Sequence, residues 1–148
     1  PSAIIRQRRV NLSSPEKRES LAGKLDAVLI DAPCSGTGVL RRNPDAKWKI
    51  TPEMVREMVP KQKQILQEYA ELVKPGGRLV YATCSLLAEE NEEVVQSFLQ
   101  ENSDFHPADA AAQLQRYGLA HLAAGECLRL APHQHGCDGF YAAALQRE

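Results

Sequence analysis

The chain has 148 residues, 43% of them hydrophobic, and a formal net charge of -1. This length supports one domain with a sizeable core and leaves too little chain for a second full domain. The near-zero charge gives no global sign of a nucleic-acid partner, although a local basic patch can still contact RNA.

The sequence also disfavours a membrane protein and a disulfide-linked scaffold. No apolar run approaches the roughly 18 residues of a membrane span, and no signal-peptide pattern opens the chain, so we expect a cytoplasmic protein. The four cysteines include no CxxC pair, which favours reduced thiols over a disulfide scaffold or a structural zinc site.

The amino-terminal part predicts a strand, a short helix and a second strand. Residues 3–12 predict a short strand, and their arginines would contact phosphate or form a solvated edge. Residues 15–22 form a short helix or a loop. The apolar run 28–30 is bounded by turn residues and predicts a strand covered on both faces, which ends at Asp31.

The residues after this strand interrupt it. Pro33 lacks an N-H group, and Gly36 and Gly38 permit backbone conformations that other residues resist, so Cys34 is expected on a loop. In open α/β sheets, ligands bind beyond the carboxyl ends of the strands. Asp31 and Cys34 are therefore placed where chemistry usually occurs.

A basic loop follows the glycines. Its candidate RNA contacts are Arg41, Arg42, Lys47 and Trp48. The cations would hold an RNA backbone and the indole would stack on a base. The alternative is a solvated loop with one half-buried aromatic side chain.

A long amphipathic helix is predicted next. Thr51 caps it, the following proline suits the first helical position, and apolar residues recur at helical spacing as far as Val73. Pro60 predicts a kink, or two helices that meet near residues 58–61. Residues 74–77, Lys-Pro-Gly-Gly, are expected to end the helix.

A second strand and helix repeat the pattern. Residues 78–83 predict a strand that ends directly at Cys84, and residues 85–100 predict a helix. We interpret the glutamates near its start as helix stabilisers, because the macrodipole favours carboxylates there. They are Glu89, Glu90, Glu92 and Glu93. Strand, helix, strand, helix is typical of a parallel sheet, so Cys34 and Cys84 should share one rim.

The last third predicts a short helix around residues 108–115 and a terminal antiparallel hairpin. Its strands are residues 127–131 and 140–145, joined by residues 132–139, and Cys127 is expected in the core. The connecting loop holds His133, His135 and Cys137. Their tight spacing with no evident fourth ligand predicts no metal site.

Three segments carry a family resemblance that covers roughly residues 25–145. They are DAPCSGTGVLRRNPDAKW, KPGGRLVYATCSLLAEENEEVV and DGFYAAAL. Together they resemble the RNA cytosine-5 methyltransferases of the NOL1/NOP2/Sun family. The resemblance implies an α/β, Rossmann-like fold, S-adenosylmethionine as methyl donor and RNA as substrate, and it favours small-subunit ribosomal RNA of the 16S type.

The same resemblance implies roles for three residues. Carbon 5 of cytosine is a poor nucleophile until a thiolate adds to carbon 6, and by similarity Cys84 is that thiolate. Cys34 would assist release of the methylated product. Asp31 would contact the methionine end of the donor or the cytosine ring.

A Rossmann-like methyltransferase normally binds its donor with a glycine-rich loop after the first strand and an acidic residue that holds the ribose. Neither feature occurs in these residues. We therefore expect residues 1–148 to be the carboxyl-terminal portion of a catalytic domain, with the rest of the enzyme upstream of Pro1. Alone, this portion should bind the donor weakly or not at all. The alternatives are a transfer RNA methyltransferase, a non-catalytic RNA-binding or ribosome-assembly module, and a thiol-disulfide switch between Cys34 and Cys84.

Overall fold

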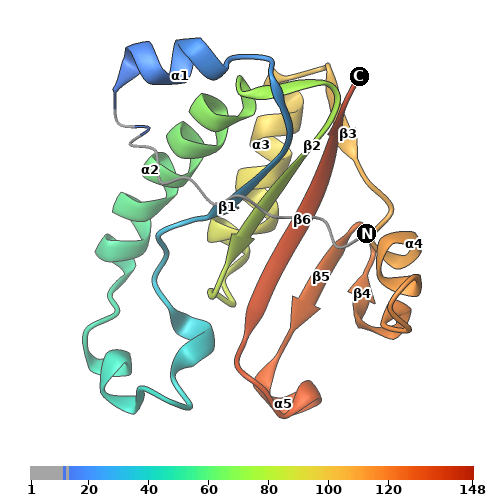
Figure 1. The fold of residues 1–148 in the computed structure, drawn as a ribbon. Coiled ribbons are helices and arrows are strands. Elements are labelled where there is room, and N and C mark those ends of the chain that lie inside the picture. Colours follow the sequence, from blue (N-terminus) through green and yellow to red (C-terminus); the bar gives the residue numbers. More distant parts are fainter. Residues whose placement is uncertain (1–11, 13) are drawn as a thin grey trace, which may run out of the picture.

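The computed structural model describes residue 12 and residues 14–148, so the predicted strand at residues 3–12 lies outside the described residues but for its last position. The described residues form a mixed six-stranded sheet in the order β1-β2-β6-β5-β4, with β3 also paired to β6 (Figure 1). The strands are β1 (Leu25–Asp31), β2 (Val73–Thr83), β3 (Phe105–Pro107), β4 (Ala123–Ala124), β5 (Cys127–Leu130) and β6 (Phe140–Arg147).

The helices include five α-helices and four short 3-10 helices within the described range. The α-helices are α1 (Pro15–Leu21), α2 (Pro52–Ala70), α3 (Glu92–Glu101), α4 (Ala110–Gln115) and α5 (Pro132–His135). The 3-10 helices are η1 (Thr37–Val39), η2 (Pro44–Trp48), η3 (Ala88–Glu90) and η4 (Ala120–Leu122). None of the helices in the described part of the chain is both long and apolar enough to cross a membrane.

Two pairings of the sheet position the candidate site. Strands β1 and β2 are parallel, and Asp31 lies opposite Ala82 at their carboxyl ends. Helix α2 connects them, as the alternation of strand and helix predicts. Strand β6 runs antiparallel to both β2 and β5, so the predicted terminal hairpin is confirmed. Cys34 and Cys84 therefore follow neighbouring strands at the same edge of the sheet.

Helix α2 is a single helix with Pro60 inside it, so the alternative of two helices is wrong. Thr51 caps it as predicted, its Oγ1 accepting from Met54 N at 3.2 Å. The buried side chains Gln62 and Leu66 follow the proline. Packing of this second half against the sheet offsets the backbone hydrogen bond that a proline removes.

The predicted end of this helix at residues 74–77 is also wrong. The helix ends at Ala70, and β2 already begins at Val73. The turn residues form an irregularity within β2, because Leu25 pairs with Val73 whereas Ala27 pairs with Arg78. The Pro-Gly-Gly sequence thus produces a turn, as its chemistry requires, but the turn interrupts a strand.

The second predicted helix begins later than expected. Residues 85–87 belong to no helix or strand, η3 follows them, and α3 starts at Glu92. The predicted helix at residues 108–115 is α4. Cys127 is half-buried and packs against the edge of the core.

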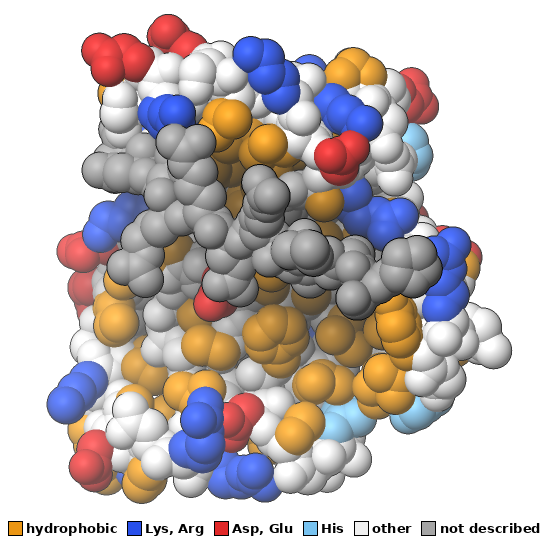
Figure 2. Space-filling model, viewed as in Figure 1, with side chains coloured by type: hydrophobic (Ala, Val, Ile, Leu, Met, Phe, Trp, Pro, Cys, Tyr) orange, Lys and Arg blue, Asp and Glu red, His pale blue; other side chains and the backbone are white. Residues whose placement is uncertain are grey.

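The core lies between the sheet and the helices α2 and α3, which stand behind the sheet in Figure 1. Alternating residues of the strands point toward it, including Leu79 and Tyr81 of β2 and Leu145 of β6. The prediction that β1 is covered on both faces is wrong, because Leu29 is 71% exposed. Figure 2 shows hydrophobic side chains gathered on the sheet face that looks away from these helices.

Candidate active site

Two cysteine sulfurs meet at the carboxyl ends of the parallel strands. Cys34 follows β1, Cys84 follows β2, and their Sγ atoms lie 3.5 Å apart. Both side chains are partly exposed, and both are free thiols. The predicted placement on one rim is confirmed, and Cys34 lies on a loop as expected.

The environment of Cys34 keeps its thiol protonated. Burial raises the pKa of the Cys34 thiol to about 12, and the neighbouring Cys84 sulfur adds to the increase. Either thiol can be the donor in the contact between the two sulfurs. The raised pKa makes Cys34 less readily ionised than an exposed thiol would be.

A buried carboxylate, Glu90, joins the two cysteine loops. Its Oε1 accepts from Ser35 N at 2.8 Å and from Gln62 Nε2 at 3.0 Å. Its Oε2 accepts from the hydroxyls of Ser35 and Ser85, both at 2.5 Å. The glutamate is fully buried, so its role differs from that of the helix stabiliser expected from the sequence. Sequence reasoning did not single out Glu90, because it is one of four neighbouring acids and only its burial distinguishes it.

Further hydrogen bonds fix the Cys84 loop. Thr37 Oγ1 lies 3.1 Å from Ser85 Oγ and accepts from Leu86 N at 2.8 Å. Asn91 Nδ2 donates to Ser85 O at 2.9 Å, and Asn91 Oδ1 accepts from Thr83 Oγ1 at 2.6 Å. The polar side chains on either side of Cys84 are thereby bonded to separate elements, which holds the loop rigid.

The backbones of three loops also meet at this edge. Gly38 N donates to Cys84 O, and Gly139 N donates to Gly38 O, each at 2.8 Å. A Cβ atom at Gly38 would lie 2.5 Å from Gly139 O and 2.6 Å from Cys84 O. Only glycine fits there, so Gly38 is a site requirement rather than a simple turn residue.

Asp31 borders a separate hollow at the end of β1. This cavity of ≈ 300 Å³ is lined by Leu29, Ile30, Asp31, Pro33, Ile65 and Tyr69. The carboxylate is exposed, and its neighbours are mainly apolar. Pro33 lines this hollow and directly precedes Cys34 in the loop after β1. The hollow therefore lies beside the loop that carries one of the two sulfurs.

The four predicted RNA contacts divide into two pairs. Arg41 donates to Gly136 O at 2.6 Å, and Arg42 forms an ion pair with Asp138, so both arginines are bonded to the loop before β6. Lys47 and Trp48 remain exposed at the end of η2. The indole is 79% exposed, and Lys47 Nζ lies 4.6 Å from its ring centroid.

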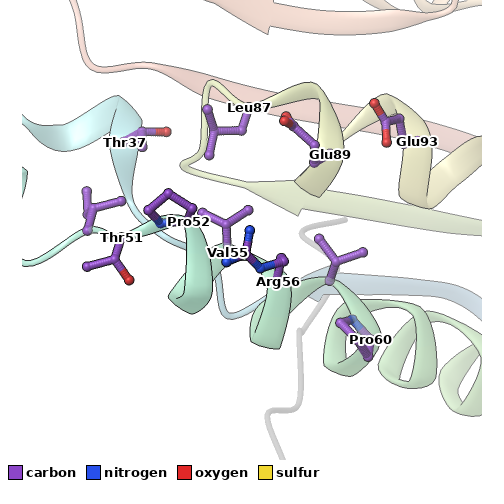
Figure 3. Close-up of a pocket in the computed structure, with 11 residues that line it drawn as sticks. Thr37, Thr51, Pro52, Val55, Arg56, Pro60, Leu87, Glu89 and Glu93 are labelled. Carbon is purple, nitrogen blue, oxygen red and sulfur yellow. The ribbon is translucent and has the colours of Figure 1, made fainter.

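A cavity of ≈ 620 Å³ lies between α2 and residues 87–93 (Figure 3). Val55 and Arg56 of α2 face Leu87 and Glu89 across it. Thr37 reaches this cavity from the Cys34 loop, but neither sulfur lines it.

The possible metal ligands of the terminal loop are not grouped. His135 Nδ1 accepts from Ala131 N at 3.0 Å, so one ring nitrogen already has a backbone partner. Within residues 14–148, no group of three or more His, Cys, Asp or Glu side chains is arranged to hold a metal ion.

The profile of the family described as 16S rRNA methyltransferase RsmB/F matches residues 5–146. The chain belongs to this family. The match includes both cysteine loops and the hairpin, so the resemblance to Sun-type methyltransferases inferred from the sequence is confirmed.

Several relatives are 38–40% identical to this chain over the residues that align. The ribosomal RNA small subunit methyltransferase B of Pasteurella multocida is 40% identical over 85% of the chain. The probable ribosomal RNA small subunit methyltransferases B of Synechocystis and of Bacillus subtilis are 39% and 38% identical over 83% and 84% of the chain. The chain spans 27–28% of the length of these relatives.

Two solved structures share the fold. NSun6 from Pyrococcus horikoshii, solved with SFG, has a TM-score of 0.71 and 26% identity over 88% of this chain and 32% of its own. A methyltransferase homologue from the same organism has a TM-score of 0.61 and 30% identity over 83% of this chain and 39% of its own. The α/β methyltransferase fold expected from the sequence is therefore confirmed.

Proposed function

We propose that the chain carries the two catalytic thiols of an RNA (cytosine-5)-methyltransferase that uses S-adenosylmethionine. The observation that supports this best is the 3.5 Å separation of Cys34 Sγ and Cys84 Sγ. At this separation one pyrimidine ring can contact both sulfurs. Their position beyond the carboxyl ends of β1 and β2 is also where open α/β sheets bind ligands.

Cys84 is the proposed nucleophile. Its sulfur forms a bond to carbon 6 of cytosine, and the electron pair of the ring double bond moves to activate carbon 5. Once Cys84 is a thiolate, the protonated Cys34 thiol at 3.5 Å can donate to it and so stabilise it before it attacks. This asymmetry favours Cys84 over Cys34 as the group that bonds to the base.

Cys34 is proposed to assist release of the product. Carbon 5 must lose its proton, and the electrons of that C-H bond restore the ring double bond as the sulfur leaves carbon 6. Cys34 first gives its proton to solvent, and its thiolate then accepts the carbon-5 proton as the Cys84 sulfur leaves carbon 6 as a thiolate. Cys34 ends as a thiol and Cys84 as a thiolate, as before the attack, and the net proton released by the reaction is in solvent.

S-adenosylmethionine, when bound, supplies an electrophilic methyl group. The hollow beside Asp31 fits one end of such a donor, because a carboxylate can accept hydrogen bonds from its ammonium group beside apolar walls. The similar structure of NSun6 was solved with SFG, an analogue of S-adenosylmethionine. Asp31 is the proposed contact of this chain with the donor.

The proposed substrate is small-subunit ribosomal RNA of the 16S type, and the proposed location of the reaction is the cytoplasm. The names of the relatives support this choice over transfer RNA. Lys47 and Trp48 are exposed and suit RNA contact directly. Arg41 and Arg42 would exchange their bonds with the loop before β6 for bonds to phosphate.

Trapping of the covalent adduct tests the reaction. The protein, with any sequence that naturally adjoins these residues, is incubated with S-adenosylmethionine and 16S-type RNA containing 5-fluorocytosine. Because fluorine replaces the hydrogen on carbon 5, no proton can be removed there and the adduct cannot break down. We expect a covalent complex on a denaturing gel, none with Cys84→Ser, and an unchanged complex with the control Cys137→Ser. With ordinary RNA, Cys34→Ala should accumulate the adduct.

Several outcomes would contradict parts of the proposal. An adduct formed by Cys84→Ser would exclude Cys84 as the nucleophile, and rapid clean turnover by Cys34→Ala would remove Cys34 from the mechanism. Methylation of transfer RNA but not ribosomal RNA would change the substrate. RNA binding without any adduct would indicate a non-catalytic module.

The sulfur separation also favours a second candidate, a thiol-disulfide switch. That function predicts a disulfide between Cys34 and Cys84 at the redox poise of the cell. Rapid thiol alkylation of cells followed by mass spectrometry distinguishes the two functions. Free thiols at both positions would support the methyltransferase, and a populated disulfide would support the switch.

A further inference from the structure

We propose that Glu90 is a positioning residue that holds the sulfurs of Cys34 and Cys84 at bonding distance from one base. The inference deepens the proposed function and depends on it for its catalytic meaning. The residue does not touch either sulfur. It acts through the serines that directly follow each cysteine, Ser35 and Ser85.

The hydrogen bonds of Glu90 link the two cysteine loops and α2. One carboxylate oxygen, Oε2, accepts from both serine hydroxyls, so a single atom joins the loop after β1 to the loop after β2. The other oxygen accepts from Ser35 N and from Gln62 Nε2. Gln62 also donates to Pro33 O at 2.8 Å, which secures the residue before Cys34.

A carboxylate suits this position better than any neutral side chain. It accepts at both oxygens and donates at neither, and four donors surround it here. Burial of an ionised side chain is unfavourable unless such hydrogen bonds compensate it, and Glu90 is fully buried. Its main-chain carbonyl also accepts from Tyr81 OH at 2.7 Å, which anchors the residue to β2.

A role limited to stabilising a helix does not account for these contacts. A carboxylate that serves the helix dipole points at the first free N-H groups of that helix. The side chain of Glu90 instead bonds to residues 35, 62 and 85, of which two belong to the cysteine loops. The bonds therefore constrain the relative position of those loops.

Capture of both sulfurs by one arsenic atom tests this inference independently of methylation. Phenylarsine oxide reacts with two thiols, forms two sulfur-arsenic bonds and releases water, so its affinity reports whether both thiols are placed together. In Glu90→Gln, the amide nitrogen cannot accept, and at least one serine bond is lost. Loss of a hydrogen bond to a charged group should weaken phenylarsine oxide binding by about tenfold. The control Glu57→Gln changes an exposed glutamate of α2 and should bind like the wild type.

Two measurements separate positioning from general loosening. Alkylation by iodoacetamide, which needs one thiol at a time, should change little in Glu90→Gln when measured well below its melting temperature, which the lost hydrogen bond lowers by several degrees. Ser35→Ala and Ser85→Ala remove single links and should each weaken capture by a smaller factor. The inference is overturned if folded Glu90→Gln captures the reagent as tightly as the wild type. It is also overturned if Glu90→Gln fails to fold and both serine variants capture the reagent normally.

The methylation assay distinguishes this inference from the proposed function. If Glu90 positions the sulfurs of a methyltransferase, Glu90→Gln should lower kcat for RNA methylation and leave the KM for S-adenosylmethionine unchanged. If the wild type captures the arsenical in a Glu90-dependent way but never methylates RNA, the proposed function fails while the positioning stands.

Discussion

The Cys34 thiol differs from that of an exposed cysteine in how it responds to pH. Burial raises its pKa to about 12, so its thiolate fraction at pH 7 to 9 is smaller than that of an ordinary thiol. Iodoacetamide reacts with the thiolate form. We expect Cys34 to be alkylated more slowly than an unstructured cysteine across this range, and its rate to keep rising well above pH 9.

Residue-resolved mass spectrometry of the alkylated protein measures this rate. The same protein unfolded in denaturant supplies the control, because burial is then lost and Cys34 should titrate as a normal thiol. A rate for folded Cys34 that levels off below pH 9 would contradict the prediction.

Sequence reasoning found the two sulfurs and missed the carboxylate beside them. Cys34 and Cys84 each follow a predicted strand end, and the strand, helix, strand order places such ends on one edge. Glu90 lies in a run of acids whose local pattern indicates only a helix start. Its burial depends on Ser35 and Gln62, which are distant in sequence, so no local signal separates it from Glu89.

At the scale of elements, η2 presents an aromatic side chain to solvent. A base stacked on an aromatic ring contributes about 1 to 3 kcal/mol to single-stranded binding. Trp48 is 79% exposed, so Trp48→Ala removes no core packing. If this element contacts RNA, Trp48→Ala should weaken RNA binding by about tenfold or more at fixed salt and leave the melting temperature unchanged.

Fluorescence anisotropy with a labelled ribosomal RNA fragment measures this affinity. Tyr117→Ala is the matched control, because Tyr117 is 78% exposed and lies beyond α4, outside the basic loop. Equal affinities of the wild type and Trp48→Ala would show that η2 does not stack on the RNA.

Element boundaries were predicted well where local chemistry acts alone. Thr51 caps α2 as expected, since a hydroxyl before a proline suits a helix start. The end of α2 was placed too late, because Pro75 and Gly76 mark a turn without specifying which element the turn interrupts. Pairing between β1 and β2 decides this, and pairing partners 48 to 51 residues apart leave no local signature.

At the scale of the whole molecule, the two faces of the sheet differ. Helices α2 and α3 cover one face, whereas apolar side chains gather on the other (Figure 2). Leu29 of β1 is also exposed. Large exposed apolar patches usually indicate a binding surface. Within the described residues, β1 pairs only with β2 and is the first strand of the sheet.

This asymmetry bears on donor binding. Asp31 and the ≈ 300 Å³ hollow lie at the end of β1. A Rossmann-like sheet holds its donor largely with a glycine-rich loop and an acid for the ribose, and these 148 residues contain neither. We therefore propose that the chain is the carboxyl-terminal portion of the catalytic domain and contributes only part of the donor site.

Calorimetric titration of residues 1–148 with S-adenosylmethionine tests this proposal. A partial site loses the contacts that fix the ribose and the adenine, so we expect no binding in the micromolar range. The same titration of the protein with its adjoining upstream sequence should give micromolar binding, which Asp31→Asn should weaken. Micromolar binding by residues 1–148 alone would mean that the hollow beside Asp31 is a complete donor site.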